Sequence, residues 1–176
     1  MFLNPSKILE QIENYHFIKV GEFGIGSGIF SEALYKKTIP QGELFLFDIR
    51  PEIIKKIYEN FKEKDFLLEK IHFLSTNLEN ENATKLKDGL LDLIVISQTL
   101  FQSKNPENIL KEAKRVTTKN GRILIIDWKE SFQGIGPQKE NLVKEEKVKK
   151  IAQKLDLKLD RKLDAGKFHY ALLFKK

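Results

Sequence analysis

The stretch EFGIGSGIF, residues 22–30, follows an apolar segment and precedes a segment with the composition of a helix. Its glycines stand at alternate positions, Gly24, Gly26 and Gly28. Glycine loses more backbone freedom on folding than any other residue, so this pattern is costly in ordered structure. A turn this bare lets the backbone approach a ligand closely, with the amides at the start of the next helix facing that ligand. The stretch therefore predicts a strand, a tight binding turn and a helix.

Outward from this turn, apolar segments alternate with helical patterns along the chain. Seven strands are predicted, over residues 17–20, 44–47, 71–75, 90–97, 122–128, 157–163 and 168–174. Helices are predicted to begin at Pro5, Pro51 and Pro106 and to cover 29–37 and 143–155. Asn120-Gly121 is expected to end the helix that begins at Pro106.

The strands are almost continuously apolar, which is typical of parallel sheets covered by helices on both faces. The last two strands are separated by the turn residues 164–167, which predict a hairpin and hence one antiparallel strand. The sequence therefore predicts an α/β fold with a doubly wound, mostly parallel seven-stranded sheet. At 176 residues, of which 41% are hydrophobic, the chain is expected to form one domain over residues 1–176.

The net charge of +6 is confined to the last part of the chain. Lys and Arg balance Asp and Glu over residues 1–138, whereas residues 139–176 are strongly basic. One interpretation is a patch that attracts an anionic partner such as RNA. The other is the solvated face of the 143–155 helix, with Lys147, Lys149, Lys150 and Lys154 in water. The second is favoured because no aromatic residues interleave with these lysines, as a single-strand binding surface would require.

Several classes of site and location are excluded or disfavoured by composition. The chain has no cysteine, which excludes disulfides, thiolate nucleophiles and cysteine-based zinc sites. His16, His72 and His169 are too scattered to indicate a metal site. The apolar segments are far shorter than the roughly 20 residues needed to span a bilayer, and the first residues do not have the pattern of a signal peptide. We therefore expect a cytoplasmic protein without a membrane partner.

The spacing of the glycines distinguishes between nucleotide ligands. In the dinucleotide motif the third glycine follows the second by three positions, and here Ile29 occupies that position. The chain contains no P-loop motif. An acid, Glu22, two positions before alternating glycines, with a second acid, Asp48, ending the next strand, resembles the Rossmann-like methyltransferases that use S-adenosylmethionine.

The resemblance extends over nearly the whole chain. FLFDIRPEII (45–54), DLIVISQTLF (92–101) and KEAKRVTTKNGRILIIDW (111–128) are similar to successive segments of that family and occur in the same order. The chain is most similar to the small-molecule branch that includes the quinone-biosynthesis C-methyltransferases. The resemblance implies a Rossmann-like methyltransferase fold, S-adenosylmethionine as the cofactor, and methyl transfer as the activity.

The resemblance also implies roles for individual residues. The predicted donor-binding residues are Glu22, Gly24, Gly26, Gly28, Asp48, Ile49, Asn77, Leu78, Ser97 and Gln98. Among them, Glu22 would position the methionine end and the glycines would allow close approach. Asp48 would bind both ribose hydroxyls, and Ser97 and Gln98 would face the reacting end of the donor.

Two residues, Ile49 and Asn77, are expected to contact the adenine ring. Ile49 would lie against it. Asn77, beside Leu78, stands where the family usually has an acid that accepts a hydrogen bond from the adenine amino group. An amide oxygen can accept the same bond more weakly. Alternatively, Asn77 caps a turn.

The acceptor is not specified by any motif. A sulfonium methyl group is already activated, so proximity and orientation can supply much of the rate enhancement, and no catalytic residue or metal is assigned. A small-molecule acceptor is preferred, in a site completed by residues 133–142 or by a second subunit in a homodimer. The alternatives are an RNA-directed methyltransferase that uses the basic C-terminal region, and an inactive partner subunit that binds the donor. Asp127 and Trp128 either line the acceptor site or pack in the core.

Overall fold

The structure is a computed structural model that describes residues 3–12, 17–38, 41–131 and 134–176. In these ranges the strands are β1 (Lys19–Phe23), β2 (Glu43–Asp48), β3 (Ile71–Ser75), β4 (Leu91–Ser97), β5 (Thr117–Trp128), β6 (Lys158–Leu163) and β7 (His169–Lys175). The α-helices are α1 (Pro5–Glu10), α2 (Ile29–Thr38), α3 (Pro51–Glu63), α4 (Pro106–Val116) and α5 (Glu145–Lys154). Short 3-10 helices cover Leu68–Lys70, Leu100–Gln102 and Lys139–Asn141.

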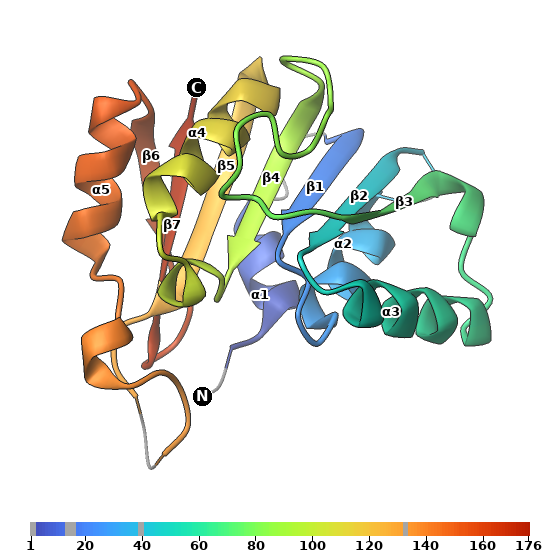
Figure 1. The fold of residues 1–176 in the computed structure, drawn as a ribbon, viewed down its shortest axis with the longest axis horizontal. Coiled ribbons are helices and arrows are strands. Elements are labelled where there is room, and N and C mark those ends of the chain that lie inside the picture. Colours follow the sequence, from blue (N-terminus) through green and yellow to red (C-terminus); the bar gives the residue numbers. More distant parts are fainter. Residues whose placement is uncertain (1–2, 13–16, 39–40, 132–133) are drawn as a thin grey trace.

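All seven strands form one sheet in the order β3-β2-β1-β4-β5-β7-β6 (Figure 1). β1 lies between β2 and β4 and is parallel to both. β7 is antiparallel to β5 and to β6, because the hairpin inserts it between them. The predicted fold class is therefore confirmed, including the single antiparallel strand that the C-terminal hairpin contributes. The strand order reverses at β1, which brings the ends of β1, β2 and β4 together where ligands bind in such sheets.

Helices cover both faces of the sheet, as the apolar strands predicted. Alternate residues of each central strand belong to different buried clusters, because successive side chains of a strand point to opposite faces. In β2, for example, Leu44 and Leu46 pack with α1, α2 and α3, whereas Phe45 and Phe47 belong to the cluster that contains α4 and α5. The two clusters hold the sheet between two helical layers and so fix the ends of its strands.

Two of the predicted element boundaries are wrong. The glycine loop was expected directly after Val20, but β1 continues to Phe23, and Glu22 and Phe23 pair with Leu46 and Phe47 of β2. Glu22 is therefore the penultimate residue of a central strand. Burial on both faces extends the strand over residues that a local pattern assigns to the turn.

The second wrong boundary is the end of α4. The helix ends at Val116, and Asn120-Gly121 lies inside β5 instead of ending the helix. Thr117 pairs with Leu91 and Arg122 with Leu93, so β5 carries extra residues between two pairings. Such an irregularity is of the β-bulge kind, and glycine suits it by allowing close approach, because a Cβ on Gly121 would lie 3.0 Å from the Asp92 carbonyl oxygen.

The helix starts at α1 and α4 agree with the sequence. Asn4 accepts a hydrogen bond from the Lys7 amide at 3.1 Å, and Asn105 accepts one from the Asn108 amide at 3.3 Å. A proline follows each cap at the first helical position, where its missing N–H costs nothing.

No helix of the described part of the chain has the length and apolar character that a membrane crossing requires.

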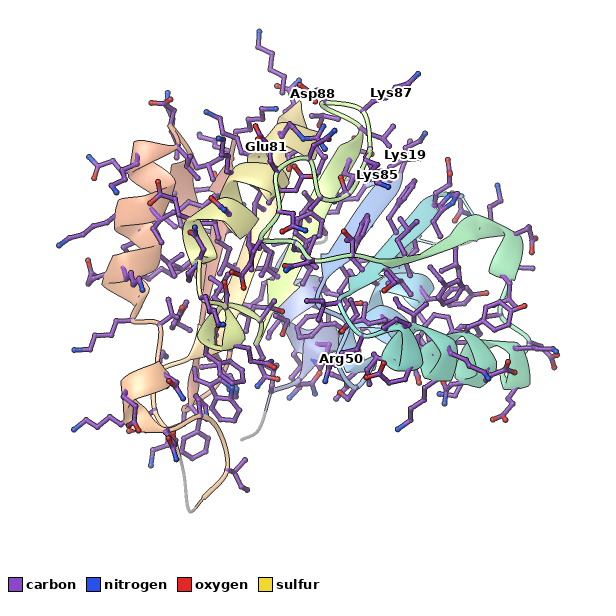
Figure 2. All side chains as sticks on the ribbon, viewed as in Figure 1. Lys19, Arg50, Glu81, Lys85, Lys87 and Asp88 are labelled. Carbon is purple, nitrogen blue, oxygen red and sulfur yellow. The ribbon has the colours of Figure 1, made fainter. Side chains whose placement is uncertain are left out.

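The parallel strands begin at one side of the sheet and end at the opposite side, and different residues lie at the two sides. Figure 2 shows Lys19 at the start of β1 and Arg50 just after the end of β2, at opposite edges of the sheet. The carboxyl-terminal edge, where Arg50 lies, is the edge at which the glycine turn follows β1.

Candidate functional site

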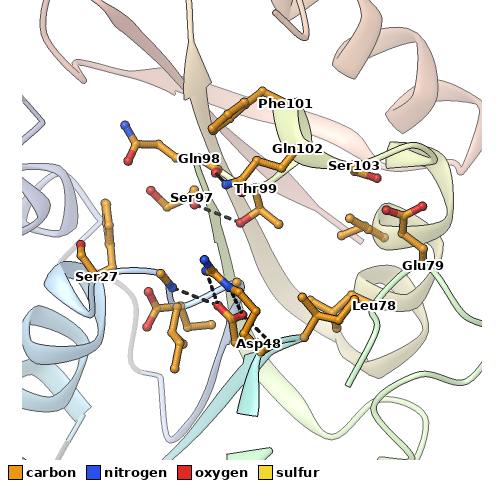
Figure 3. A pocket seen from close by; sticks show the side chains of 18 of the residues that line it. Ser27, Asp48, Leu78, Glu79, Ser97, Gln98, Thr99, Phe101, Gln102 and Ser103 are labelled. Atoms are coloured by element: carbon orange, nitrogen blue, oxygen red, sulfur yellow. Dashed lines mark hydrogen bonds and ion pairs between the residues drawn. The ribbon is translucent and has the colours of Figure 1, made fainter. Parts of the chain in front are cut away.

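A pocket of about 580 Å³ lies at the carboxyl ends of β1, β2 and β4, within the size range of small-molecule sites. Figure 3 shows Asp48 on one side of this pocket and Ser97, Gln98 and Thr99 on the other. Of the ten predicted site residues, the lining contains Glu22, Gly24, Gly26, Asp48, Ile49, Asn77, Leu78, Ser97 and Gln98. Gly28 is not in the lining.

The glycine turn is held by the end of the neighbouring strand. The amides of Gly24 and Ile25 both donate to the Phe47 carbonyl, at 2.8 and 3.2 Å. The three glycines have φ values of +82°, +50° and +80°, a backbone region that other residues rarely adopt. The turn therefore requires glycine for its conformation, whether or not a ligand is present.

Each glycine of the turn has a different neighbour. A Cβ on Gly24 would lie 2.9 Å from the Thr99 Cγ2, and a Cβ on Gly28 would overlap the Ile57 side chain of α3. A Cβ on Gly26 would meet nothing within 4 Å. Gly26 thus leaves backbone facing the open pocket, Gly24 allows β1 and β4 to approach, and Gly28 allows the turn to pack on α3.

Asp48 lies at the end of β2 and is 3% exposed. The Gly26 amide donates to its Oδ2 at 3.2 Å, so the glycine turn and the second predicted acid are directly bonded. The Arg50 amide and side chain also donate to this carboxylate. Burial by itself would raise the pKa of Asp48, but these hydrogen bonds together lower it below its ordinary value. Asp48 is therefore ionised at neutral pH.

Glu22 is fully buried beneath the turn, at 1% exposure. The Ser31 hydroxyl, in the first turns of α2, donates to its Oε2 at 2.5 Å. Burial raises the pKa of Glu22 to about 8, the Ser31 bond lowers it, and the nearby Asp48 charge raises it further. Glu22 and Asp48 are thus two acids in one pocket with opposite pKa shifts, and Glu22 is protonated at neutral pH.

Asn77 and Leu78 reach the pocket from the loop after β3. The Asn77 Oδ1 accepts a hydrogen bond from the Glu79 amide at 3.0 Å, which is the turn-capping role given above as its alternative. The Glu79 carboxylate accepts the amides of Lys104 and Asn105, at 3.2 and 3.0 Å, and so ties this loop to the start of α4. The amide oxygen of Asn77 is therefore already engaged within the protein.

Gln98 has φ +51° and contacts His169 from the end of β4. The Gln98 Nε2 lies 2.7 Å from the His169 Nε2, and the His169 ring packs on Trp128 with centroids 4.2 Å apart. Burial lowers the pKa of His169 to about 4, with a smaller contribution from Lys129, so the imidazole is neutral. His169 is therefore a buried residue that also touches a residue of the pocket lining.

Asp127 is buried and does not line the pocket, whereas Trp128 does. The Asp127 carboxylate accepts the Trp128 amide at 2.8 Å and the Phe101 amide at 3.2 Å. Burial raises the pKa of Asp127 to about 7, and these bonds oppose the shift. Asp127 therefore holds the Leu100–Gln102 turn, and only Trp128 takes the pocket position considered for the pair.

Sequence reasoning missed the part of the lining that follows β4 and the residue beside Asp48. The missed residues include Arg50, Thr99, Phe101, Gln102 and Ser103. Their position within a few residues of the ends of the predicted strands 90–97 and 44–47 was the available signal, because residues that follow the ends of adjacent parallel strands meet at one edge of the sheet.

Part of the 133–142 segment, expected to complete an acceptor site, does reach the pocket. Gly136 is in the lining, and a Cβ there would lie 3.0 Å from the Trp128 ring. Gln133, which begins the segment, lies outside the described residues, as does His16. Among the described residues, no group of three side chains of metal-binding type is close enough to hold a metal ion.

The basic C-terminal helix α5 lies away from this pocket. Its Val148, Ile151 and Ala152 are buried, and Leu155, on the same apolar stripe, is partly buried. Lys149 pairs with Glu145 at 2.6 Å, and Lys154 pairs with Glu107 of α4 at 3.4 Å. Lys147, Lys150 and Lys154 are exposed, so the solvated face is formed, and two lysines of the helix, Lys149 and Lys154, have glutamate partners.

Comparison with protein-family models gives one match that spans most of the chain. A model described as a methyltransferase domain matches residues 18–171. The matched range contains every predicted site residue. A search of curated protein sequences gave no significant match.

Solved structures with the same fold include methyltransferases. A methyltransferase from Aquifex aeolicus that depends on S-adenosylmethionine is 22% identical with a TM-score of 0.86, over 98% of this chain and 89% of that one. A protein from Sulfolobus solfataricus assigned to the type 11 methyltransferases is 20% identical with a TM-score of 0.81, over 100% and 94%. The carbon methyltransferase CurJ is 14% identical with a TM-score of 0.75, over 95% and 51%. At these identities the likeness establishes the Rossmann-like methyltransferase fold.

Proposed function

The chain belongs to the methyltransferase domain family and is an S-adenosylmethionine-dependent methyltransferase, and from this premise we propose that the described pocket binds the donor and that the acceptor is a small molecule. The observation that carries the placement is the 3.2 Å bond from the Gly26 amide to Asp48. It joins both parts of the predicted binding signature in one pocket. On this proposal residues 1–176 act as one donor-binding domain.

The residues present fit the donor. Asp48 is a buried, ionised carboxylate at the pocket wall, suited to accept hydrogen bonds from ribose hydroxyls. Gly24 and Gly26 place bare backbone beside it. Ile49 and Leu78 supply apolar surface for a planar base, and Glu22 lies below the turn for the methionine end. When bound, the donor supplies a methyl group on a sulfonium sulfur.

A small acceptor is supported by the remaining lining. The side chains after β4 are uncharged, and Phe101 and Trp128 add aromatic surface. These groups suit the positioning of a weakly polar molecule, and for an activated methyl group positioning is the main requirement. A site of the small-molecule branch, which includes the quinone-biosynthesis C-methyltransferases, fits this lining. Neither the RNA-directed alternative nor a homodimer gains support from the described residues.

The placement of the donor predicts the effect of Asp48→Ala. Loss of the charge-assisted bonds to the ribose should weaken binding of S-adenosylhomocysteine by roughly 10- to 100-fold, about 1.5–3 kcal/mol. Isothermal titration calorimetry measures this directly. The control is Asp88→Ala, which removes an 80% exposed carboxylate at the opposite edge of the sheet (Figure 2). Equal affinity of wild type and Asp48→Ala would remove Asp48 from the site.

The acceptor class and the alternative of an inactive subunit are separated by turnover. Purified protein is incubated with labelled donor and either pooled small metabolites or pooled RNA. We expect label in the small-molecule fraction. Label in RNA would overturn the acceptor proposal, and donor binding without transfer to either pool would favour the inactive partner subunit.

A further inference from the structure

The Asp48 carboxylate has its hydrogen-bonding positions filled by the protein itself. Its Oδ1 accepts the Arg50 amide and the Arg50 Nε, each at 3.0 Å. Its Oδ2 accepts the Gly26 amide at 3.2 Å and the Arg50 Nη2 at 3.3 Å. A carboxylate offers about four lone-pair positions, so no position is left for a further donor.

Two of these four donors are fixed and two are removable. The backbone amides of Gly26 and Arg50 are held by the glycine turn and by the start of α3. The Arg50 guanidinium is attached to a side chain that is 46% exposed. Arg50 precedes α3 as its N-cap residue, but its side chain makes no capping bond. The guanidinium can therefore leave Asp48 without disturbing the helix or the turn.

We propose that Arg50 sets the affinity for the methyl donor, because its guanidinium occupies the two positions of Asp48 that the ribose hydroxyls must take. This inference rests on the proposed function. Each carboxylate oxygen keeps one backbone amide when the donor binds and exchanges one guanidinium N–H for one hydroxyl. The donor affinity is thereby lowered by the free energy of the ion pair that has to open.

The electrostatics of the site explain why a replaceable partner is useful. Asp48 is almost completely buried, and a buried carboxylate without enough donors would take up a proton. Against the effect of burial, the guanidinium and the backbone amides of Arg50 and Gly26 all lower the pKa of Asp48, and the amides remain to keep the acid ionised for the hydroxyls when the guanidinium leaves. After it leaves Asp48, the Arg50 guanidinium still has a negative charge nearby, because Glu52, two residues away in the sequence, already interacts with it electrostatically.

The test is donor binding to Arg50→Met, which keeps an unbranched apolar stem and removes the competing donors. We expect S-adenosylhomocysteine to bind roughly 3- to 10-fold more tightly to this variant than to wild type, the range expected for an ion pair whose arginine is half-exposed. The affinity for adenosine should rise by a similar factor. In contrast, 2′,3′-dideoxyadenosine, which lacks the 2′- and 3′-hydroxyls, should bind wild type and Arg50→Met with equal affinity. Isothermal titration calorimetry at low ionic strength gives all three comparisons.

The matched control is Lys19→Met, which breaks another half-exposed ion pair, with Glu43 at 3.4 Å, at the opposite edge of the sheet (Figure 2). It should leave every affinity unchanged. Unchanged or weaker S-adenosylhomocysteine binding by Arg50→Met would overturn the inference, as would an equal gain for the dideoxy compound. Failure of the wild type to bind S-adenosylhomocysteine is a different result, which would overturn the proposed function and the inference together.

Discussion

Glu22 is a carboxylic acid placed where water does not reach it. Its folded pKa of about 8 stands against an ordinary value of 4.5, because burial disfavours the charged form. Between these two values the folded chain holds a proton that the unfolded chain has released. The stability of the folded protein should therefore fall as the pH rises from about 5 to 8 through this group.

Glu22→Gln isolates that contribution. Glutamine keeps an oxygen for the Ser31 hydroxyl and carries no charge, so the variant should be more stable than wild type at pH 8, by on the order of a few kcal/mol. The difference should shrink as the pH falls below the ordinary pKa of 4.5, where wild-type Glu22 becomes protonated in both states. Thermal unfolding at several pH values measures it, with the exposed Glu10→Gln as control. A difference independent of pH would contradict the assignment.

The residue Gly24 shows two separate reasons why the turn needs glycine, a positive φ and close packing. Gly24 combines φ +82° with close approach to Thr99, whose hydroxyl donates to the Phe23 carbonyl at 3.0 Å. Glycine therefore allows β1 to pack against β4 and also keeps the pocket free of side chains at the turn. A sequence pattern of alternate glycines indicates both requirements without separating them.

At the scale of elements, α4 organises the irregular segment between β3 and β4. Glu112 is 4% exposed and accepts the Thr84 amide at 2.9 Å and its hydroxyl at 2.6 Å. Arg115 donates to both oxygens of Glu112 at 2.8 Å and also to the Leu86 carbonyl. This network holds the chain that continues from the pocket residues Asn77 and Leu78.

Glu112→Gln should therefore destabilise the protein by roughly 3 kcal/mol, because it removes the buried one of the two carboxylates, Glu112 and Asp88, that pair with the Arg115 guanidinium. The pKa of Glu112 is lowered by Arg115 and Thr84 against an opposing effect of burial. Its contribution to stability is thus present above its ordinary pKa and is lost as the pH falls below that value. Urea denaturation at pH 7 and pH 4 measures both effects.

The control for this network is Glu107→Gln, in the same helix, whose partner Lys154 is largely exposed. An exposed pair should contribute about 0–1 kcal/mol. Similar losses for the two variants would mean that the Glu112 network holds nothing beyond an ordinary surface ion pair.

At the scale of the whole molecule, the segment that contains the first helix, α1, contacts the C-terminal hairpin of β6 and β7. Gln11, directly after α1, exchanges two hydrogen bonds with the backbone of Asp164, at 2.9 and 2.8 Å. Ile8, Leu9 and Ile12 are at most 2% exposed and belong to the cluster with α2 and α3. The two ends of the chain are therefore part of one core.

Leu9→Ala should lower the free energy of unfolding by about 2–4 kcal/mol, since it removes a buried side chain and leaves a cavity. Gln11→Ala, which removes only the polar contacts, should cost about 1 kcal/mol. Equilibrium unfolding in urea compares them. A loss below 1 kcal/mol for Leu9→Ala would show that α1 is not an integral part of the core.

The sequence by itself determined the class of fold and brought most of the predicted residues to one pocket. Apolar strands without polar alternation require helices on both faces, and this local pattern is sufficient for the parallel sheet. Parallel strands end at a common edge, so the residues that follow the first, second and fourth strands were predictable as neighbours. Nine of the ten predicted residues do line one pocket because that rule depends on topology alone.

Only the tertiary structure decided the neighbours of each side chain. It placed Glu22 within a strand and packed Gly28 against Ile57. It also showed that the Asn77 side-chain oxygen accepts the Glu79 amide and that the Asp48 carboxylate accepts hydrogen bonds from Arg50. These outcomes depend on contacts within a few ångströms, between residues that a periodic pattern leaves unpaired. Hydrogen bonds and burial act over such distances, so the charge state of each acid follows from packing and not from its position in a motif.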